Sequence, residues 1–424
     1  MKIKVKKSIL NGTIAVPGSK SHTIRAVAIA SAANGLSVIK SPLISEDTLS
    51  ALAASEILGA EVEKYDTFWR INGTSGKLNL NSDTIDMGNS GTSLRIFTAL
   101  ASMGDKIVKF DGDESLRSRP MASLLSALRD LGVKVETSNN KCPLSVQGPA
   151  KGGKTVIDGT SSQFLTALLI ALPMAENDSF LNVVNLNEIP YVEITLGWLA
   201  RQGISMEYPD DLSSFHIKGG QTYSAFDTLI PADFSTAAFP LVGAALTAGK
   251  VNIKNLDFSD LQGDKMVFEF LQKMGTDIIF SENDTIVSAS SSLIGQEFDL
   301  NSTPDALPVM AVAGAFASGQ TSLLNCPQAR IKETDRIKCM TIELKKLGCQ
   351  IEELEDGMII HGGASLIGTE LHGYSDHRIV MALTIAGMLI DGETIIDTAE
   401  AAAVTYPSFI EDFKKLGADI TIID

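Results

Sequence analysis

The sequence is poor in the residues that build disulfide frameworks and metal centres. Its 424 residues include four cysteines and five histidines. The cysteines form no CxxC pair and the histidines no HExxH motif, so we expect no zinc site and no other metal. We expect four reduced, buried thiols, at Cys142, Cys326, Cys339 and Cys349.

The chain also lacks long apolar runs and an excess of positive charge. No apolar run reaches the roughly 18 residues of a membrane span, and the lysine-rich start, Met1–Lys7, does not resemble a secretion signal. The formal net charge is -16, whereas nucleic acids and anionic membranes are bound by clustered Lys and Arg. We expect a cytoplasmic protein with neither as a partner.

What the sequence does contain is a repeat: a helix end, a glycine and an alternating strand recur six times at intervals of roughly 70 residues. Glycine suits the left-handed position that closes a helix, and the alternation suits a half-buried strand. The repeated glycines are Gly59, Gly132, Gly203, Gly275, Gly348 and Gly417.

A second helix precedes that glycine-terminated helix in every copy, and it is apolar on nearly all sides, so it must be buried. Each opens from a loop of Gly, Ser, Asn or Asp, which cap helix N-termini. We therefore expect the polar helix starts to gather at one end of the buried helices. The expected helices span 24–33, 94–103, 164–175, 236–248, 307–317 and 379–389.

The length of the chain favours two domains, because 424 residues exceed what a single core usually supports. Six repeats divide naturally into two sets of three. We place the joint near Pro231, where the fourth repeat starts.

Charged and polar residues interrupt the starts of the buried helices in the first half of the chain. Lys20, Ser21 and Arg25 follow Pro17-Gly18-Ser19 at a helix start, where the positive end of the helix dipole favours anions. An ordinary solvated helix start explains this cluster equally well.

Two further clusters have the same ambiguity. One cluster consists of Asn89, Gly91, Arg95 and Arg119. Its glycine would let a ligand approach the backbone closely, and its guanidinium groups can bind phosphate or carboxylate in a fork. The run Ser161-Ser162-Gln163 offers hydroxyls and free N–H groups to an anion. A plain turn and plain capping would account for each alone.

The fourth cluster is the most informative. It consists of Asp305, the run 330–336 (Arg-Ile-Lys-Glu-Thr-Asp-Arg) and Asp376-His377-Arg378. If these segments pack together, they place carboxylates among four basic groups: Arg330, Lys332, Arg336 and Arg378. Such a setting separates acid and base roles by pKa. All four clusters coincide at one end of the expected helices, which makes a merely solvated surface a poor explanation.

These motifs together resemble the enolpyruvyl transferases, in the branch that acts on shikimate 3-phosphate. The likeness covers essentially the whole chain. Its most specific elements are Pro17-Gly18-Ser19-Lys20-Ser21, Ser161-Ser162-Gln163-Phe164-Leu165-Thr166, Lys332-Glu333-Thr334-Asp335-Arg336 and Asp376-His377-Arg378.

The resemblance implies an α/β fold of two inverse α/β domains, each of three βαβαββ repeats with buried parallel helices. Residues 1–17 plus 231–424 would form one domain and residues 18–230 the other, with the first strand in the C-terminal half and the active site in the cleft between the domains. It implies a monomeric enzyme of aromatic amino acid biosynthesis. The enzyme would transfer the enolpyruvyl group of phosphoenolpyruvate to the 5-hydroxyl of shikimate 3-phosphate, with no cofactor.

The resemblance also implies roles for individual residues. Asp305 would take the 5-hydroxyl proton, Glu333 would protonate the methylene carbon, and Lys20 would assist proton transfer and bind the transferring phosphate. Shikimate 3-phosphate would contact Lys20, Ser21, Arg25, Ser161, Ser162, Gln163, Tyr191, Asp305 and Lys332. Phosphoenolpyruvate would contact Lys20, Asn89, Gly91, Arg119, Gln163, Arg336 and Arg378.

Two positions depart from the family pattern. Val404 stands where many relatives carry a lysine, so a phosphate contact is missing or supplied elsewhere. Glu188 replaces a phosphate-binding serine two residues before Pro190, and its charge would repel phosphate if it pointed inward. Either the local alignment slips there or that edge of the site is rebuilt.

Two rival functions stay open. The sister transferase that acts on UDP-N-acetylglucosamine has the same fold, but it typically uses a cysteine acid on the loop that corresponds to 111–121, where this chain has none. Six repeats could also form a clamp on nucleic acid, which the net charge and the asymmetric charged clusters oppose.

Overall fold

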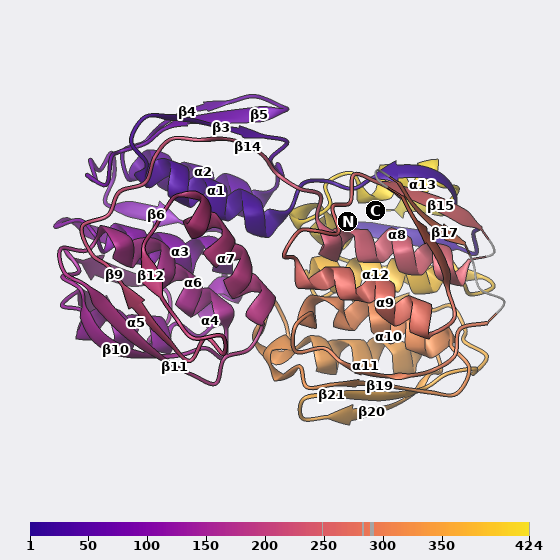
Figure 1. Cartoon of the computed structure of the whole chain (residues 1–424). Helices are drawn as coiled ribbons and strands as arrows, with labels where there is room; N and C mark the ends of the chain where they lie inside the picture. The colour runs from indigo at the N-terminus through magenta and orange to yellow at the C-terminus, as the bar shows by residue number, and fades with distance from the viewer. Residues whose placement is uncertain (248, 282–283, 289–291, 424) are drawn as a thin grey trace. The chain divides into compact units, whose positions relative to one another are not determined.

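The computed structural model describes residues 1–247, 249–281, 284–288 and 292–423, so residue 248 of the expected helix 236–248 lies outside the described residues. The chain forms two compact units. We call Met1–Pro17 with Pro231–Asp424 the discontinuous unit and Gly18–Ile230 the continuous unit (Figure 1).

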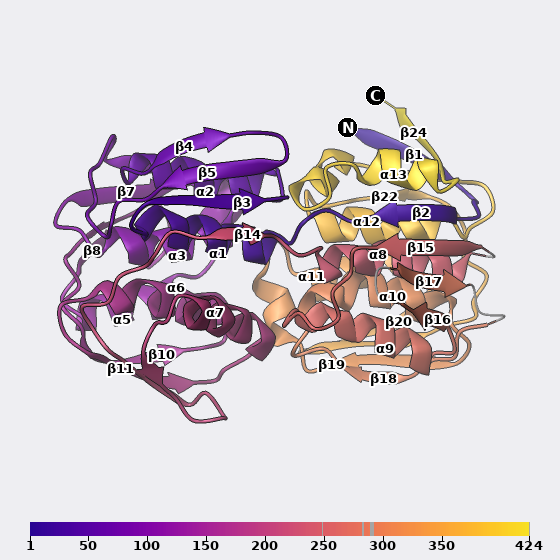
Figure 2. The same ribbon diagram turned by 45° about the horizontal axis from the view of Figure 1, so that its top comes forward.

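Six apolar helices form the interior, as expected. In the continuous unit α3 packs against α1 and α6, and in the discontinuous unit α8, α10 and α12 pack against one another (Figure 2). Their bounds are α1 Lys20–Ala32, α3 Gly91–Ala101, α6 Ser162–Ala171, α8 Phe234–Leu246, α10 Leu307–Phe316 and α12 His377–Gly387.

The observed bounds differ slightly from the expected ones. Every helix except α10 begins two to four residues earlier than expected, because the first turn carries polar side chains outside the apolar run. The helices end one to four residues earlier, and apolar residues beyond the ends, such as Ala33 and Ala317, stay buried in the connecting turns.

The six repeated glycines close six further helices, and all six have the expected positive φ, between 69° and 107°. A strand follows each of them, as expected. The helices are α2 Glu46–Ile57, α5 Ala122–Asp130, α7 Ile189–Arg201, α9 Met266–Lys273, α11 Arg336–Lys346 and α13 Phe409–Lys415. The short α4, Glu114–Ser118, lies outside this pattern.

Three four-stranded sheets enclose the helices of the continuous unit, each with one parallel and two antiparallel pairings. Their orders are β14-β3-β5-β4, β6-β7-β9-β8 and β10-β11-β13-β12. The strands are β3 Leu36–Lys40, β4 Glu61–Lys64, β5 Phe68–Asn72, β6 Thr84–Asp86, β7 Ile107–Asp111, β8 Lys134–Thr137, β9 Leu144–Gln147, β10 Gly153–Asp158, β11 Ser179–Val184, β12 Met206–Glu207, β13 Ser214–Ile217 and β14 Asp227–Leu229.

The discontinuous unit repeats the same sheet pattern. Its orders are β16-β17-β15-β2, β18-β19-β21-β20 and β22-β23-β1-β24, so the first strand of the chain joins the last repeat, as expected. The strands are β1 Lys2–Lys6, β2 Asn11–Ala15, β15 Lys250–Lys254, β16 Asp277–Phe280, β17 Asp284–Ser288, β18 Glu297–Asp299, β19 Gln320–Leu324, β20 Gln350–Leu354, β21 Gly357–His361, β22 Glu370–Leu371, β23 Glu393–Ile396 and β24 Asp419–Ile423.

Each unit has its own hydrophobic core, which confirms the α/β fold of buried helices under small mixed sheets. The four cysteines are free and buried, also as expected. No helix in the described ranges combines the length and apolar character that crossing a membrane requires.

The glycine positions provide a matched stability test. Gly59 and Gly132 both have positive φ, but a Cβ at Gly59 would lie 2.5 Å from the carbonyl oxygen of Asn79, whereas a Cβ at Gly132 would meet nothing within 4 Å. Gly132→Ala should lower the free energy of unfolding by about 1–2 kcal/mol, the backbone strain alone. Gly59→Ala should lower it further, because the backbone of the loop at Asn79 must also move. Urea unfolding of both variants measures the difference, and equal losses would contradict the clash argument.

Candidate active site

The helix starts of the discontinuous unit meet around Arg378, in the first turn of α12. Its Nη2 lies 2.9 Å from Oδ2 of Asp305, which stands in the short 3₁₀ helix Pro304–Ala306 before α10. The same nitrogen donates to the hydroxyl of Ser235 on α8, at 2.9 Å. Three buried helices therefore present polar groups to one point, as the sequence predicts.

Arg336, the first residue of α11, is the most enclosed charge of this cluster, with 1% of its side chain exposed. Its guanidinium pairs with Asp305 at 2.9 Å, with Asp376 at 2.8 Å and with Glu333. Burial alone would lower the pKa of Arg336, but the attraction of Asp376, Glu333 and Asp305 outweighs it and raises the pKa. The guanidinium therefore stays charged and fixed.

Asp305 lies among three cations. Besides Arg336 and Arg378, the ammonium of Lys332 is 3.8 Å from its carboxylate. Burial would raise the pKa of Asp305, yet Arg378, Lys332 and Arg336 together hold it well below its usual range. In this state Asp305 is a firmly ionised carboxylate.

Arg330, the fourth basic group of this cluster in the sequence, is not part of it. Its guanidinium binds Asp335 at 2.7 Å, Glu353 at 3.0 Å and the backbone oxygen of Glu355 at 2.7 Å. These contacts tie the loop before α11 to β20. The expectation of four basic groups is wrong by one, because Arg330 lies in the 3₁₀ helix Pro327–Ile331, from which its side chain reaches β20 and the turn after it.

Asp376 has a role that the sequence did not assign to it. Its oxygens accept from Nε of Arg336 at 2.8 Å, from the hydroxyl of Thr334 at 3.0 Å and from the backbone N–H of Arg378 at 2.9 Å. One carboxylate thus caps α12 and orients both arginines. The position of Asp376 directly before an apolar helix predicts that it caps α12. It does not predict that Asp376 also pairs with Arg336 of α11.

A second carboxyl near Asp305 was not expected at all. Asp264, 3% exposed, accepts a hydrogen bond of 2.8 Å from the hydroxyl of Thr303. Burial, and then the negative charge of Asp305, raises the pKa of Asp264 to about 6. Its sequence neighbours, Gly263 and Lys265, give no sign of this environment.

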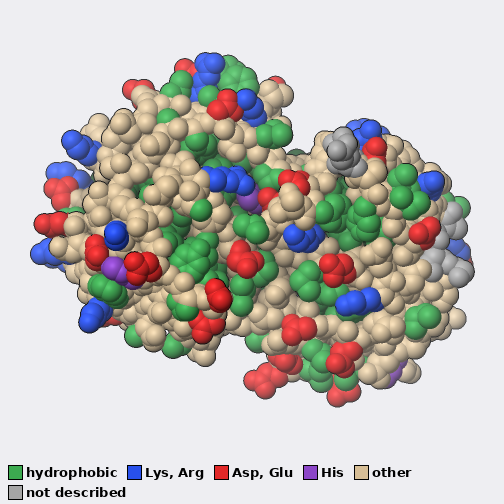
Figure 3. Space-filling view, viewed as in Figure 1, with side chains coloured by type: hydrophobic (Ala, Val, Ile, Leu, Met, Phe, Trp, Pro, Cys, Tyr) green, Lys and Arg blue, Asp and Glu red, His purple; other side chains and the backbone are tan. Residues whose placement is uncertain are grey.

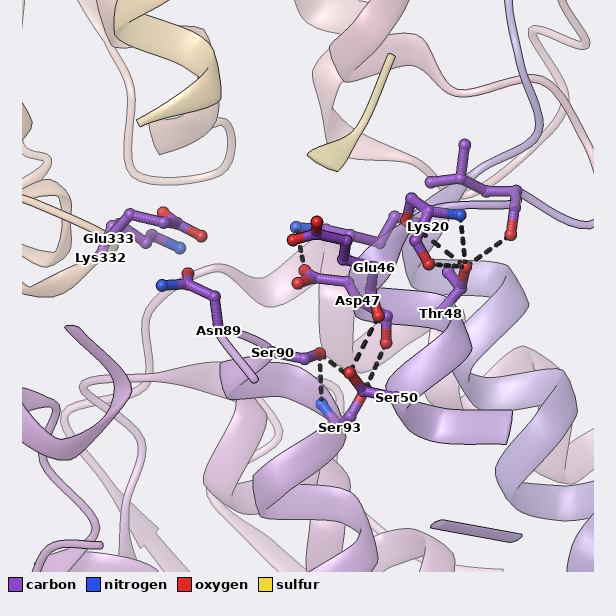
Figure 4. Close-up of polar contacts among 12 residues, drawn as sticks. Lys20, Glu46, Asp47, Thr48, Ser50, Asn89, Ser90, Ser93, Lys332 and Glu333 are labelled. Atoms are coloured by element: carbon purple, nitrogen blue, oxygen red, sulfur yellow. Dashed lines mark hydrogen bonds and ion pairs between the residues drawn. The ribbon is translucent and has the colours of Figure 1, made fainter. Parts of the chain in front are cut away.

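In the continuous unit, Lys20 at the start of α1 pairs with Asp47 of α2, with 3.0 Å between Nζ and Oδ2 (Figure 4). The backbone oxygen of Asp47 also accepts from the hydroxyl of Ser93 on α3, at 3.0 Å. Asp47 therefore connects three helix starts. The sequence shows it only as an acidic residue in the first turn of a helix.

The second sequence cluster is held together by side-chain hydrogen bonds. Nη2 of Arg119 donates to the amide oxygen of Asn89 and, at 3.1 Å, to the hydroxyl of Ser115, and Arg95 donates to Gln163. Gly91 leaves room for these guanidinium groups, because a Cβ there would lie 2.5 Å from Nη1 of Arg95 and 3.0 Å from Nη1 of Arg119. A side chain at this position would therefore displace the guanidinium groups of both arginines.

Arg25, expected from the family resemblance to contact shikimate 3-phosphate, is almost fully buried inside the continuous unit, with 2% of its surface exposed. It donates to Thr195 at 2.9 Å, to Thr166 at 3.3 Å, to the backbone oxygen of Tyr191 at 2.8 Å and to that of Ser21 at 3.0 Å. These contacts use four of its five N–H donors. Burial lowers its pKa to about 10.

The two departures from the family pattern are also located. Glu188 accepts hydrogen bonds from both the N–H and the hydroxyl of Ser162, whereas Ser161, the cap residue of α6, uses no side-chain cap bond. Val404 is half-buried at the end of the 3₁₀ helix Ala399–Val404. Within the described ranges, no group of three or more His, Cys, Asp or Glu could hold a metal ion.

Comparisons with known proteins agree with one another. The family model for EPSP synthase (3-phosphoshikimate 1-carboxyvinyltransferase) matches residues 5–413. The chain is 48% identical to the 3-phosphoshikimate 1-carboxyvinyltransferase of Acetivibrio thermocellus, covering 99% of each chain, and 45% identical to that of Ruminiclostridium cellulolyticum, covering 100% of each. A solved EPSP synthase from Acinetobacter baumannii superposes with a TM-score of 0.84 at 27% identity, covering 99% of this chain and 100% of that one.

The raised pKa of Asp264 predicts a pH dependence of stability. The stabilisation from this shift is complete below the unfolded pKa of about 3.9 and is lost as pH rises through the folded value of about 6. Between pH 4 and pH 7 the wild type should therefore lose about 2 kcal/mol of unfolding free energy relative to Asp264→Asn. Urea unfolding at several pH values measures this, with Glu269→Gln, an exposed change in the same unit, as the control. Parallel pH profiles for wild type and Asp264→Asn would contradict the assignment.

Proposed function

Because the chain belongs to the EPSP synthase family and transfers the enolpyruvyl group of phosphoenolpyruvate to the 5-hydroxyl of shikimate 3-phosphate, we propose that the charged helix starts of both units carry out this transfer. The observation that carries the proposal is the enclosure of Asp305 by Arg336, Arg378 and Lys332. In this arrangement the carboxylate of Asp305 can act as a base, and the three cations around it can bind anionic substrates.

In this proposal, phosphoenolpyruvate takes over the contacts that protein carboxylates make with Arg336 and Arg378 in the ligand-free protein. Arg336 and Arg378 are held in place by Asp305 and Asp376 without a ligand. Guanidinium groups bind carboxylate and phosphate in a fork, so preformed arginines need little reordering when the substrate arrives. Lys20, Asn89, Gly91, Arg119 and Gln163 would contact the same substrate.

Asp305 acts as the base for the 5-hydroxyl proton in this proposal. A carboxylate whose pKa is held low accepts a proton poorly, and the cations around Asp305 hold its pKa low. When the substrate anions engage Arg378, Lys332 and Arg336, that attraction weakens and the basicity of Asp305 rises. Substrate binding would thus activate the base.

Glu333 and Lys20 complete the chemistry. Addition of the 5-hydroxyl to phosphoenolpyruvate requires a proton on the methylene carbon, which Glu333 would supply, and gives a tetrahedral intermediate. Elimination then breaks the bond to phosphate and returns one methyl proton to the Glu333 carboxylate, which produces the enol ether. Lys20, released from Asp47, would stabilise the departing phosphate and assist proton transfer.

Shikimate 3-phosphate would be held by Ser161, Ser162, Gln163, Tyr191, Lys332 and Ser21. For Arg25 we propose chiefly a positioning role, because most of its donors are engaged inside the unit and one of them fixes the backbone of Tyr191. The fifth N–H donor of Arg25 would contact shikimate 3-phosphate. The phosphate contact that Val404 cannot make would come from these groups.

The rival functions are less well supported. The family and the relatives favour shikimate 3-phosphate over UDP-N-acetylglucosamine as acceptor. On the face drawn in Figure 3, Lys and Arg are scattered among Asp and Glu without a continuous basic patch, which is a poor surface for nucleic acid. The monomeric state and the cytoplasmic location stay predictions.

Phosphate release tests the function directly. With phosphoenolpyruvate present, release should require shikimate 3-phosphate and should not occur with UDP-N-acetylglucosamine. Faster release with the nucleotide sugar would contradict the assignment. Omitting each substrate in turn provides the control for contaminating phosphatase.

The role of Asp305 is tested by Asp305→Asn. Loss of the base should lower kcat by at least about 100-fold, while the affinity for phosphoenolpyruvate should be kept or increased, because Arg336 and Arg378 lose a competing partner. Steady-state kinetics give kcat, and calorimetric titration gives the affinity. A near-normal kcat would remove Asp305 from this role.

A further inference from the structure

The carboxylate of Glu188 occupies the N-terminus of α6. It is 1% exposed and accepts two hydrogen bonds from Ser162, from the N–H at 3.2 Å and from the hydroxyl at 2.7 Å. The first turn of α6 has no acidic residue of its own, so the carboxylate of Glu188 supplies the negative charge at the positive end of the helix dipole. An internal group thus takes the place where an external anion would bind.

The backbone before α7 holds Glu188 in this place at the expense of strain. Its φ and ψ are 56° and 42°, in the left-handed region that residues with a side chain seldom adopt. The N–H of Asn187 donates to Gly159 at 3.0 Å and the N–H of Tyr191 donates to Glu188 at 3.0 Å, which anchors the turn on both sides. The carboxylate is therefore positioned by the fold and is not a freely mobile surface group.

A phosphate at this helix start requires the same donors. On the proposed function, on which this inference rests, Ser161 and Ser162 hold the 3-phosphate of shikimate 3-phosphate. The N–H and hydroxyl of Ser162 cannot serve Glu188 and a phosphate at once, and two anions so close in a water-poor site repel strongly. Either the carboxylate leaves or the phosphate binds against its charge.

We propose that Glu188 is an internal competitor of the substrate phosphate and so sets the affinity of this site for phosphorylated ligands. In the ligand-free protein it satisfies the donors of Ser162 and neutralises the start of α6. A free phosphate ion must displace it without other help. Shikimate 3-phosphate offsets this cost with the additional contacts of its ring, so Glu188 weakens the binding of both ligands but only the complete substrate still binds tightly.

The test separates charge from capping. Glu188→Gln keeps an oxygen that can accept from Ser162 but removes the charge, and Glu188→Ser removes the charge and leaves only a short hydroxyl, the group that the family pattern has at this position. Glu193→Gln, an exposed change on the same helix α7, alters the net charge equally and serves as the matched control. Calorimetric titration of each protein with shikimate 3-phosphate, unphosphorylated shikimate and inorganic phosphate gives the dissociation constants, and thermal unfolding reports whether each variant is folded.

We expect Glu188→Gln and Glu188→Ser to bind shikimate 3-phosphate at least about 10-fold more tightly than the wild type, to bind inorganic phosphate more tightly as well, and to bind shikimate unchanged. Glu193→Gln should behave as the wild type. Unchanged or weaker binding of shikimate 3-phosphate by a folded Glu188→Gln or Glu188→Ser would overturn the inference and leave Glu188 as a helix cap. Failure of the wild type to bind shikimate 3-phosphate would instead overturn the proposed function, and this inference with it.

Discussion

The charged residues of the discontinuous unit are held in place by the ion pairs of one buried guanidinium group, that of Arg336. It sits at the start of α11 and pairs with carboxylates from three separate segments: Asp305, Glu333 and Asp376. A buried charge that loses its partners is strongly destabilising, so each segment is constrained by the same cation. The position of Asp305, and through Asp376 that of Arg378, follows from this network.

In the continuous unit, the helix starts are also joined by buried polar contacts, whereas in the discontinuous unit Arg336 alone pairs with three carboxylates. The contacts of the continuous unit are made by Asp47, which binds Lys20 and accepts from Ser93, and by Arg25, which reaches Thr166 and Tyr191. Both units therefore use internal partners to hold groups that suit anionic ligands. Glu188 extends this logic, because it supplies an internal anion at a helix start that the substrate phosphate would otherwise occupy.

Much of the fold could be predicted from local sequence. Burial of the six apolar helices follows from their composition, and the positive φ of the glycines that close the neighbouring helices follows from steric preference. Helix bounds were predicted less accurately because polar first turns do not belong to the apolar run. The pairing of β1 with β23 and β24 required the family resemblance, since no local pattern specifies a partner almost 400 residues away.

The sequence by itself determined the repeats, the buried helices, the motifs that identify the family and the residue types at the helix starts. Only the tertiary structure decided which of these residues meet. It turned Arg330 toward Glu353, placed Asp264 beside Asp305, joined Asp47 to Lys20 and directed Glu188 to Ser162. The physical reason is that secondary structure is encoded by neighbours in the chain, whereas ion pairs and pKa shifts depend on distances between segments that only packing brings together.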